Sequence, residues 1–219
     1  KRMKRNIITL LVLLMTVFFT LSAQSYNQLW KEVQQYEQAG RPQSVIETAQ
    51  TIFAKAQQER FAPQMMRAYL TAMAHRSHLS VDSFYVDIAG LEAWVADPVT
   101  PVSDAAMLHS LLGSLYTNYA RGSYDNKVVE PLPEDMSQWT QLMYHQQAFD
   151  HFMASVSRLE ELRGFSTLAY APLTYQGRWS DYYQHDLMHL IGRRAANGIQ
   201  QLEYRLSRAF TQTDWKSFT

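Results

Sequence analysis

The fold is decided by the stretch RPQSVIETAQTIFAKAQQER, residues 41 to 60. Its apolar residues recur every three or four positions, the spacing of one face of an α-helix. They are Val45, Ile46, Ala49, Ile52, Phe53 and Ala56. Pro42 stands in the first turn, where the missing N–H of proline costs nothing because that group has no partner inside the helix. We therefore predict a helix here with one buried face.

The neighbouring segments carry the same pattern. In the preceding stretch, Ser25 is followed three residues later by Gln28, which is the arrangement of a helix capping box, and Gly40 ends the segment. After the quoted stretch, Pro63 opens another predicted helix, and a further one covers residues 83–96 and stops before Pro98. The first hundred residues thus predict helices joined by short turns.

The second half of the chain continues as helix with one long interruption. Turn-forming residues fill the interruption at 121–135. The predicted elements around it are a helix after Asp104, the longest helix at about 136–163 ended by Gly164, a structured loop at 165–180, and a last helix at about 181–210.

These elements predict an all-α fold of antiparallel helical hairpins stacked as a TPR-like, α-solenoid-type array. The predicted domains are a signal peptide at 1–23 and a helical-repeat-like domain at 24–219, which we expect to be an N-terminal fragment of a larger protein. Ala49, Phe53 and Ala56 match the second helix of a tetratricopeptide repeat. Pro63 lies two residues later than the repeat pattern requires, and the pattern of the first helix of the repeat is not matched. A degenerate hairpin array is therefore favoured over true repeats.

The N-terminus predicts export. A basic cluster (Lys1, Arg2, Lys4 and Arg5) precedes an apolar run from Ile7 to Leu21, and small residues follow it in LSAQS. This is the three-part layout of a secretory signal. The run is about 15 residues long, short of the roughly 20 that a membrane-spanning helix needs, so cleavage is favoured over an uncleaved anchor. We expect a periplasmic, outer-membrane-surface or extracellular protein.

Composition excludes several classes of site. The chain has no cysteine, so disulfides, thiol catalysis and cysteine-based zinc sites are excluded, and no lipoprotein anchor is expected. Four of the 20 Lys and Arg residues lie in the signal, so the remainder carries 16 basic and 20 acidic residues, a net charge of −4. A mildly acidic chain lacks the basic surface that nucleic acid requires.

The stretch YYQHDLMHLIG, residues 182 to 192, resembles the helix of a zinc protease, because His185 and His189 lie four apart. However, Asp186 is one methylene shorter than the glutamate of that motif, and the local sequence supplies no third ligand. The distant candidates for a third ligand are His145 and His151 on the preceding predicted helix. On a helical wheel the pair lies away from the apolar stripe. We predict surface or inter-helix packing, no metal and no cofactor, and structural roles for His75, His78 and His109.

Aromatic side chains crowd the loop before the last helix. They are Tyr170, Tyr175, Trp179, Tyr182 and Tyr183. Such a cluster can stack sugars or anchor a protein partner, and it can also pin an irregular loop to a helical array. Pinning is the favoured interpretation, and the five residues are also the candidate interaction surface.

Several segments taken together resemble the N-terminal helical region of large bacterial α2-macroglobulin-like proteins: residues 24–59, 62–70 (APQMMRAYL), 82–94 (DSFYVDIAGLEAW) and 180–191 (SDYYQHDLMHLI). The resemblance implies a position ahead of a string of β-sandwich macroglobulin domains, in a protein that traps proteases outside the cytoplasm. The thioester of that family needs a cysteine, which this chain lacks. None of the family's reactive residues is therefore transferred.

The leading hypothesis is a non-catalytic, exported helical module that docks or spaces the downstream macroglobulin-type domains of the same polypeptide, or contacts envelope proteins or proteases. An alternative is an envelope protein that captures a glycan or solute. A third hypothesis is a metal-dependent hydrolase that uses His185, Asp186 and His189.

Overall fold

The computed structural model describes residues 25–120, 131–171, 173–174 and 186–213, and for 203–213 only the backbone. These residues form seven α-helices and three short 3-10 helices, and no strand lies among them apart from one isolated bridge between Ser166 and Asp186. The all-α prediction is confirmed, while the predicted signal at 1–23 lies outside the described residues. The chain divides into two compact units, one ending at Val81 and one beginning at Asp82.

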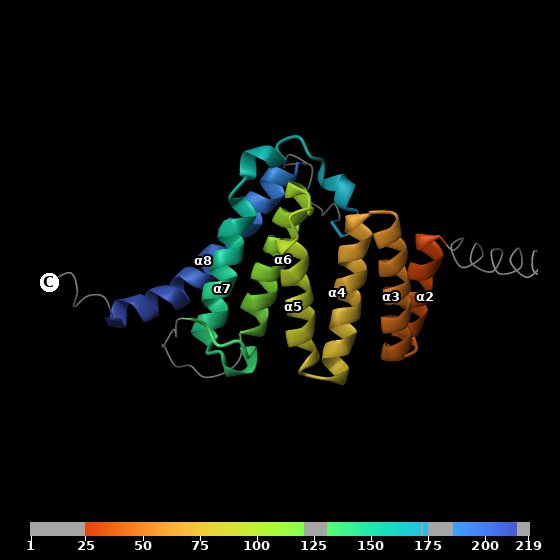
Figure 1. The fold of residues 1–219 in the computed structure, drawn as a ribbon, viewed down its shortest axis with the longest axis horizontal. Helices are drawn as coiled ribbons and strands as arrows, with labels where there is room; N and C mark the ends of the chain where they lie inside the picture. The colour runs from red at the N-terminus through yellow and green to blue at the C-terminus, as the bar shows by residue number, and fades with distance from the viewer. Residues whose placement is uncertain (1–24, 121–130, 172, 175–185, 214–219) are drawn as a thin grey trace, which may run out of the picture. The chain divides into compact units, whose positions relative to one another are not determined.

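The first unit contains three helices that lie side by side, α2 (Tyr26–Gln38), α3 (Pro42–Gln58) and α4 (Ala62–Leu79) (Figure 1). The predicted capping box begins α2, since the Ser25 hydroxyl accepts from Gln28 N–H while the Gln28 side chain accepts from Ser25 N–H. The apolar stripe of the opening stretch is buried against the neighbouring helices. The core of this unit includes Leu29, Val33, Val45, Ile46, Ala49, Ile52, Ala56, Met66 and Ala68.

The two turns of the first unit have the same backbone structure. After α2, Gly40 N–H donates to Glu37 O and Arg41 N–H donates to Tyr36 O. After α3, Arg60 and Phe61 make the equivalent bonds to Gln57 O and Ala56 O. Both turns are Schellman C-caps, which require one residue in the left-handed region. That residue is Gly40 (φ +63°) in the first turn and Arg60 (φ +53°) in the second.

The second unit contains four helices, α5 (Ser83–Ala96), α6 (Val102–Tyr119), α7 (Gln141–Val156) and α8 (Leu187–Thr213) (Figure 1). Helix α6 packs against α5, α7 and α8, and α7 also packs against α8. Its 3-10 helices are η1 (Met136–Gln138), η2 (Leu159–Leu162) and η3 (Thr167–Tyr170). No helix among the described residues is both long and apolar enough to cross a membrane.

The single long helix predicted at 136–163 is wrong. A 3-10 turn capped by Asp135 comes first, and the chain is then extended at Trp139, whose indole N–H donates to Pro133 O (2.7 Å). Thr140 starts α7 as its N-cap, with its hydroxyl accepting from Met143 N–H. The helix ends at Val156, before η2. Local side-chain caps therefore divide an apolar pattern that is continuous in the sequence.

Helices α6, α7 and α8 meet around the ring of Phe152, which is 3% exposed. A Cβ atom built on Gly113 of α6 would lie 2.9 Å from ring carbons Cδ1 and Cε1. A Cβ atom on Gly198 of α8 would lie 2.8 Å from Cδ2 and closer still to Cε2 and Cζ. The ring thus occupies a slot that exists because both positions lack a side chain.

Candidate functional site

The segment that joins α7 to α8 is held to the second unit by a buried tyrosine. Tyr170 belongs to η3, is only 4% exposed, and donates its hydroxyl hydrogen to the Asp104 carboxylate in the first turn of α6. Burial raises the pKa of Asp104, although the hydrogen bond from Tyr170 opposes this effect. Burial and the carboxylate together raise the pKa of Tyr170. A neutral phenol therefore anchors the segment to α6.

Backbone bonds complete the attachment. Leu187 N–H at the start of α8 donates to Phe165 O (2.7 Å), next to the isolated bridge between Ser166 and Asp186. The Thr174 hydroxyl donates to Thr167 O (2.7 Å). Residues 163–171, called the braced loop below, are thus fixed at both ends and in the middle.

The braced loop presents two apolar side chains to solvent. Phe165 is 51% exposed and Leu168 is 56% exposed. Single exposed apolar residues are common on protein surfaces, but these two lie on a short segment whose backbone is held by several hydrogen bonds. Because the backbone is already fixed, little backbone entropy is lost when a partner covers these side chains.

The aromatic residues singled out from the sequence have different positions. Tyr170 faces inward and pins the loop, so little of its ring is left for a ligand. The other four lie outside the described residues, namely Tyr175, Trp179, Tyr182 and Tyr183. The exposed apolar side chains of this segment, Phe165 and Leu168, were not singled out in the sequence.

Of the predicted histidine pair, only His189 is described. Its Nδ1 lies 2.7 Å from Asp186 Oδ1, and its backbone N–H donates to the same oxygen (2.9 Å), so Asp186 caps the first turn of α8. Burial raises the pKa of Asp186, but these hydrogen bonds outweigh it and the net pKa is lowered. His185 lies outside the described residues. In the described part of the chain, no group of three His, Cys, Asp or Glu side chains is placed to hold a metal ion.

A different histidine pair belongs to a polar cluster that joins helices of the second unit. His109 Nδ1 on α6 lies 2.9 Å from His151 Nδ1 on α7, and His151 Nε2 lies 2.8 Å from Glu92 Oε1 on α5. Tyr116 of α6 donates its hydroxyl hydrogen to the same Glu92 oxygen (2.7 Å), and its ring stacks on His151. These four residues, called the histidine relay below, connect three helices.

The Glu92 carboxylate fixes the hydrogen-bond direction at one end of the relay. Burial raises the pKa of Glu92, but the hydrogen bonds from His151 and Tyr116 outweigh it and the net pKa is lowered. An ionised Glu92 accepts from His151 Nε2–H. The contact between the two Nδ1 atoms requires one of the two rings to donate and the other to accept. Burial and the nearby His151 lower the pKa of His109, which favours its neutral form.

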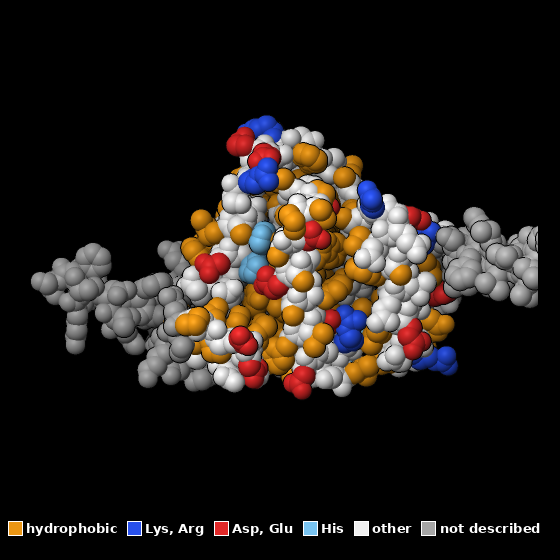
Figure 2. Space-filling model, in the orientation of Figure 1, with side chains coloured by type: hydrophobic (Ala, Val, Ile, Leu, Met, Phe, Trp, Pro, Cys, Tyr) orange, Lys and Arg blue, Asp and Glu red, His pale blue; other side chains and the backbone are white. Residues whose placement is uncertain are grey.

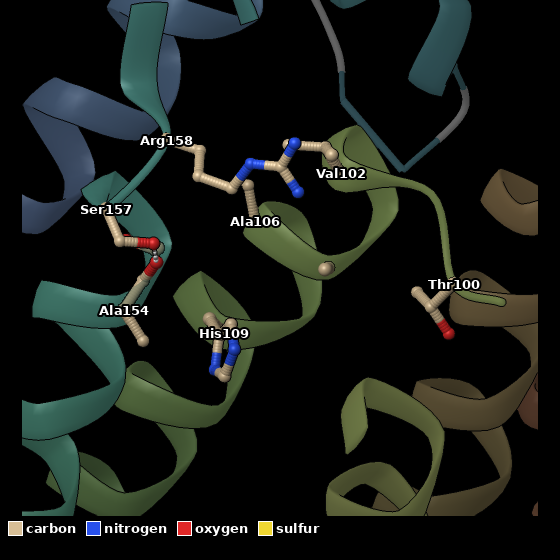
Figure 3. Close-up of a pocket in the computed structure, with 9 residues that line it drawn as sticks. Thr100, Val102, Ala106, His109, Ala154, Ser157 and Arg158 are labelled. Atoms are coloured by element: carbon tan, nitrogen blue, oxygen red, sulfur yellow. Dashed lines mark hydrogen bonds between the residues drawn. The ribbon is translucent and has the colours of Figure 1, made fainter. Parts of the chain in front are cut away.

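His109 lines a cavity of about 170 Å³ between α6 and α7, together with residues that include Thr100, Val102 and Arg158 (Figure 3). Histidine side chains reach the surface where these two helices meet (Figure 2). Arg158 extends from the end of α7 towards Val102, and its Nε and Nη2 both donate to Glu161 (2.6 Å each). No acidic side chain is found among the described residues that line the cavity.

One ring nitrogen of His109, which lines this cavity, is open to water. Every buried side-chain nitrogen or oxygen in the described part of the chain has a hydrogen-bond partner. His109 Nε2 has none, and it is therefore accessible to water. The nearby hydroxyls of Ser155 and Ser157 donate to backbone carbonyls of α7, so neither donates to His109.

The relay does not show in the sequence, because its members are up to 59 positions apart. The sequence pattern predicted a structural role for His109 and offered His151 only as a distant metal ligand, whereas both ring nitrogens of His151 are engaged within the relay. The other candidate, His145, is buried in α7. His75 Nε2 lies 3.2 Å from Glu37 and joins α4 to α2.

No protein-family model, curated protein sequence or solved structure matches this chain.

Proposed function

We propose that this chain is a non-catalytic docking module of an exported α2-macroglobulin-like, protease-trapping protein. In this proposal the predicted signal directs export, and the helical hairpins belong to a TPR-like array. The module binds a β-sandwich macroglobulin domain of the same polypeptide. The order of the four sequence segments described above supports the assignment to this class of protein.

One structural observation carries the docking role, namely the exposure of Phe165 and Leu168 on the braced loop. A partner surface that covered both side chains would bury apolar groups worth about 1.5–3 kcal/mol each when fully removed from water. The hydrogen bond between Tyr170 and Asp104 holds the loop in place before the partner arrives. This pre-organisation reduces the entropy lost on binding.

The first test is the gene itself. Sequencing past the codon for Thr219 is expected to reveal segments that encode antiparallel β-sandwich domains. A reading frame without such domains on either side would contradict the proposal.

The second test measures binding between this chain and the adjacent β-sandwich domain by isothermal titration calorimetry. A double variant, Phe165→Ser with Leu168→Ser, is expected to weaken binding by about tenfold or more, since each 1.4 kcal/mol corresponds to a factor of ten. The matched control is Val86→Ser, which removes another apolar side chain, 74% exposed, from the same unit. Equal loss in the control and the double variant would refute docking through the braced loop.

A further inference from the structure

A second cavity, of about 230 Å³, lies between α6 and α8, and Arg194 is one of the residues that line it. Arg194 is half-buried and donates from Nε to Ser110 Oγ (2.8 Å) and from Nη2 to Ser114 Oγ (3.1 Å). Nη1 has no hydrogen-bond partner among the described residues, and no described carboxylate pairs with this side chain. Burial lowers the pKa of Arg194.

This arrangement is unusual because a positive charge removed from water is normally paired with a negative one. The two serines fix the direction of the guanidinium without neutralising it. The Ser114 hydroxyl donates to Ser110 O (3.1 Å), so its oxygen accepts from Arg194 and has no proton left for another acceptor. The unused N–H groups of the guanidinium are therefore available to an anion.

The walls of the cavity supply additional polar groups. Asn197 and Gln201 lie three and seven positions after Arg194, on the same face of α8, and Asn118 faces them from α6. All three amides are exposed, and each offers N–H donors and a carbonyl acceptor. The Thr117 hydroxyl donates to Gly113 O (2.8 Å) and keeps its lone pairs for a ligand hydroxyl. No acidic side chain occurs among the described residues that line this cavity.

We propose that this cavity binds a small hydroxylated oxyanion, a sugar phosphate or a sugar acid, with Arg194 as the counter-ion of its anionic group. The guanidinium suits both groups, because its planar donors match two oxygens of a phosphate or carboxylate. The amides and Thr117 bind the ligand's hydroxyl groups. The volume of the cavity is several times that of a single water molecule, which is about 30 Å³. The cavity therefore has room for a sugar ring in addition to the anionic group. This site goes beyond the docking function and uses none of its residues.

Isothermal titration calorimetry on the full chain tests the proposal with four probes: glucose 6-phosphate, glucuronate, neutral glucose and inorganic phosphate. We expect glucose 6-phosphate or glucuronate to bind, and the tighter of the two identifies the anionic group. Neutral glucose and inorganic phosphate should bind at least about tenfold more weakly, because each lacks one of the two recognised features. Binding of either as tightly as the acidic sugars, or no binding by any probe, would overturn the proposal.

Variants of neighbouring residues on α8 locate the site. Arg194→Gln should weaken binding by about tenfold or more, the effect of losing a charge-assisted hydrogen bond. Arg193→Gln removes the same charge from the adjacent exposed position and should change affinity less than about twofold. Because Arg194→Gln also removes two internal hydrogen bonds, Asn197→Ala provides a second variant at an exposed position, and it too should weaken binding. Equal losses in the Arg193 and Arg194 variants would show a diffuse charge effect and refute the site.

Discussion

Two glycines of α8 provide a sharp test of the packing around Phe152. In a helix interior, replacing glycine by alanine stabilises by about 1 kcal/mol when the new methyl group has space. At Gly192 the added Cβ would lie 3.6 Å from Leu159 Cδ2, an ordinary contact. Gly192→Ala is therefore expected to increase the free energy of unfolding by about 1 kcal/mol.

Gly198→Ala is expected to have the opposite sign. Its Cβ would lie 2.8 Å from Phe152 Cδ2 and closer to two further ring carbons, whereas carbon atoms pack at about 3.5–4.0 Å. The ring has little room to retreat, because Gly113 approaches it from the other side. Overpacking of this kind costs about 1–3 kcal/mol, and the confined ring places this site near the upper value. After the gain in helix propensity, a net loss of about 2 kcal/mol remains.

Urea unfolding followed by far-UV circular dichroism measures both variants, with the change read from the midpoint at constant slope. A smaller side chain at position 152 should relieve the clash, so Phe152→Leu should cost less in the Gly198→Ala background than in the wild type. That coupling in a double-mutant cycle separates a steric cause from a general loss of stability. A Gly198→Ala protein as stable as Gly192→Ala would refute the proposed slot.

Smaller perturbations test the remaining contacts. Folding lowers the pKa of His109 below the usual histidine value of 6.5, so the unfolded chain binds more protons than the folded protein as the pH falls below that value. The free energy of unfolding should therefore decrease from about pH 7.5 to about pH 5.5. Over the same pH range, the urea midpoint of a His109→Gln variant should decrease less than that of the wild type. An identical decrease would show that His109 is not the cause of the pH dependence. Tyr170→Phe removes the hydrogen bond to Asp104 and should lower the free energy of unfolding by about 1–3 kcal/mol. It should also speed amide hydrogen exchange in the braced loop. Unchanged exchange would show that other contacts hold the loop. Ser25→Ala should destabilise the first unit by about 1 kcal/mol in the same urea assay, and no change would mean that the cap contributes nothing.

Helical periodicity predicted the buried faces well where one helix carries one uninterrupted stripe. In α8 the apolar residues at helical spacing are all at most 2% exposed, namely Leu187, Ile191, Ala195 and Leu202. In α3 the stripe from Val45 to Ala56 is also largely buried. Such stripes are specified by the sequence alone because the apolar period coincides with the period of the helix.

Helix breaks and polar contacts between helices could not be predicted in this way. The break before α7 depends on the caps formed by Asp135 and Thr140, and these do not disturb the apolar pattern. The histidine relay depends on the packing of three helices, which brings Glu92 and His151 together across 59 positions. The cavity beside Arg194 depends on which residues α6 places opposite α8. Each of these features is tertiary, and a periodic pattern contains no information about it.

The two turns of the first unit repeat one backbone structure at both ends of α3. Gly40 and Arg60 are twenty residues apart, with α3 between them, and both reverse the chain with the same pair of backbone bonds. A single helix inserted at either turn would therefore reverse the direction of the helices that follow it, whereas a pair of helices joined by the same turn would leave that direction unchanged. The left-handed backbone at Arg60 also marks the place where an exchange to glycine would relieve the conformational penalty that a side chain incurs there.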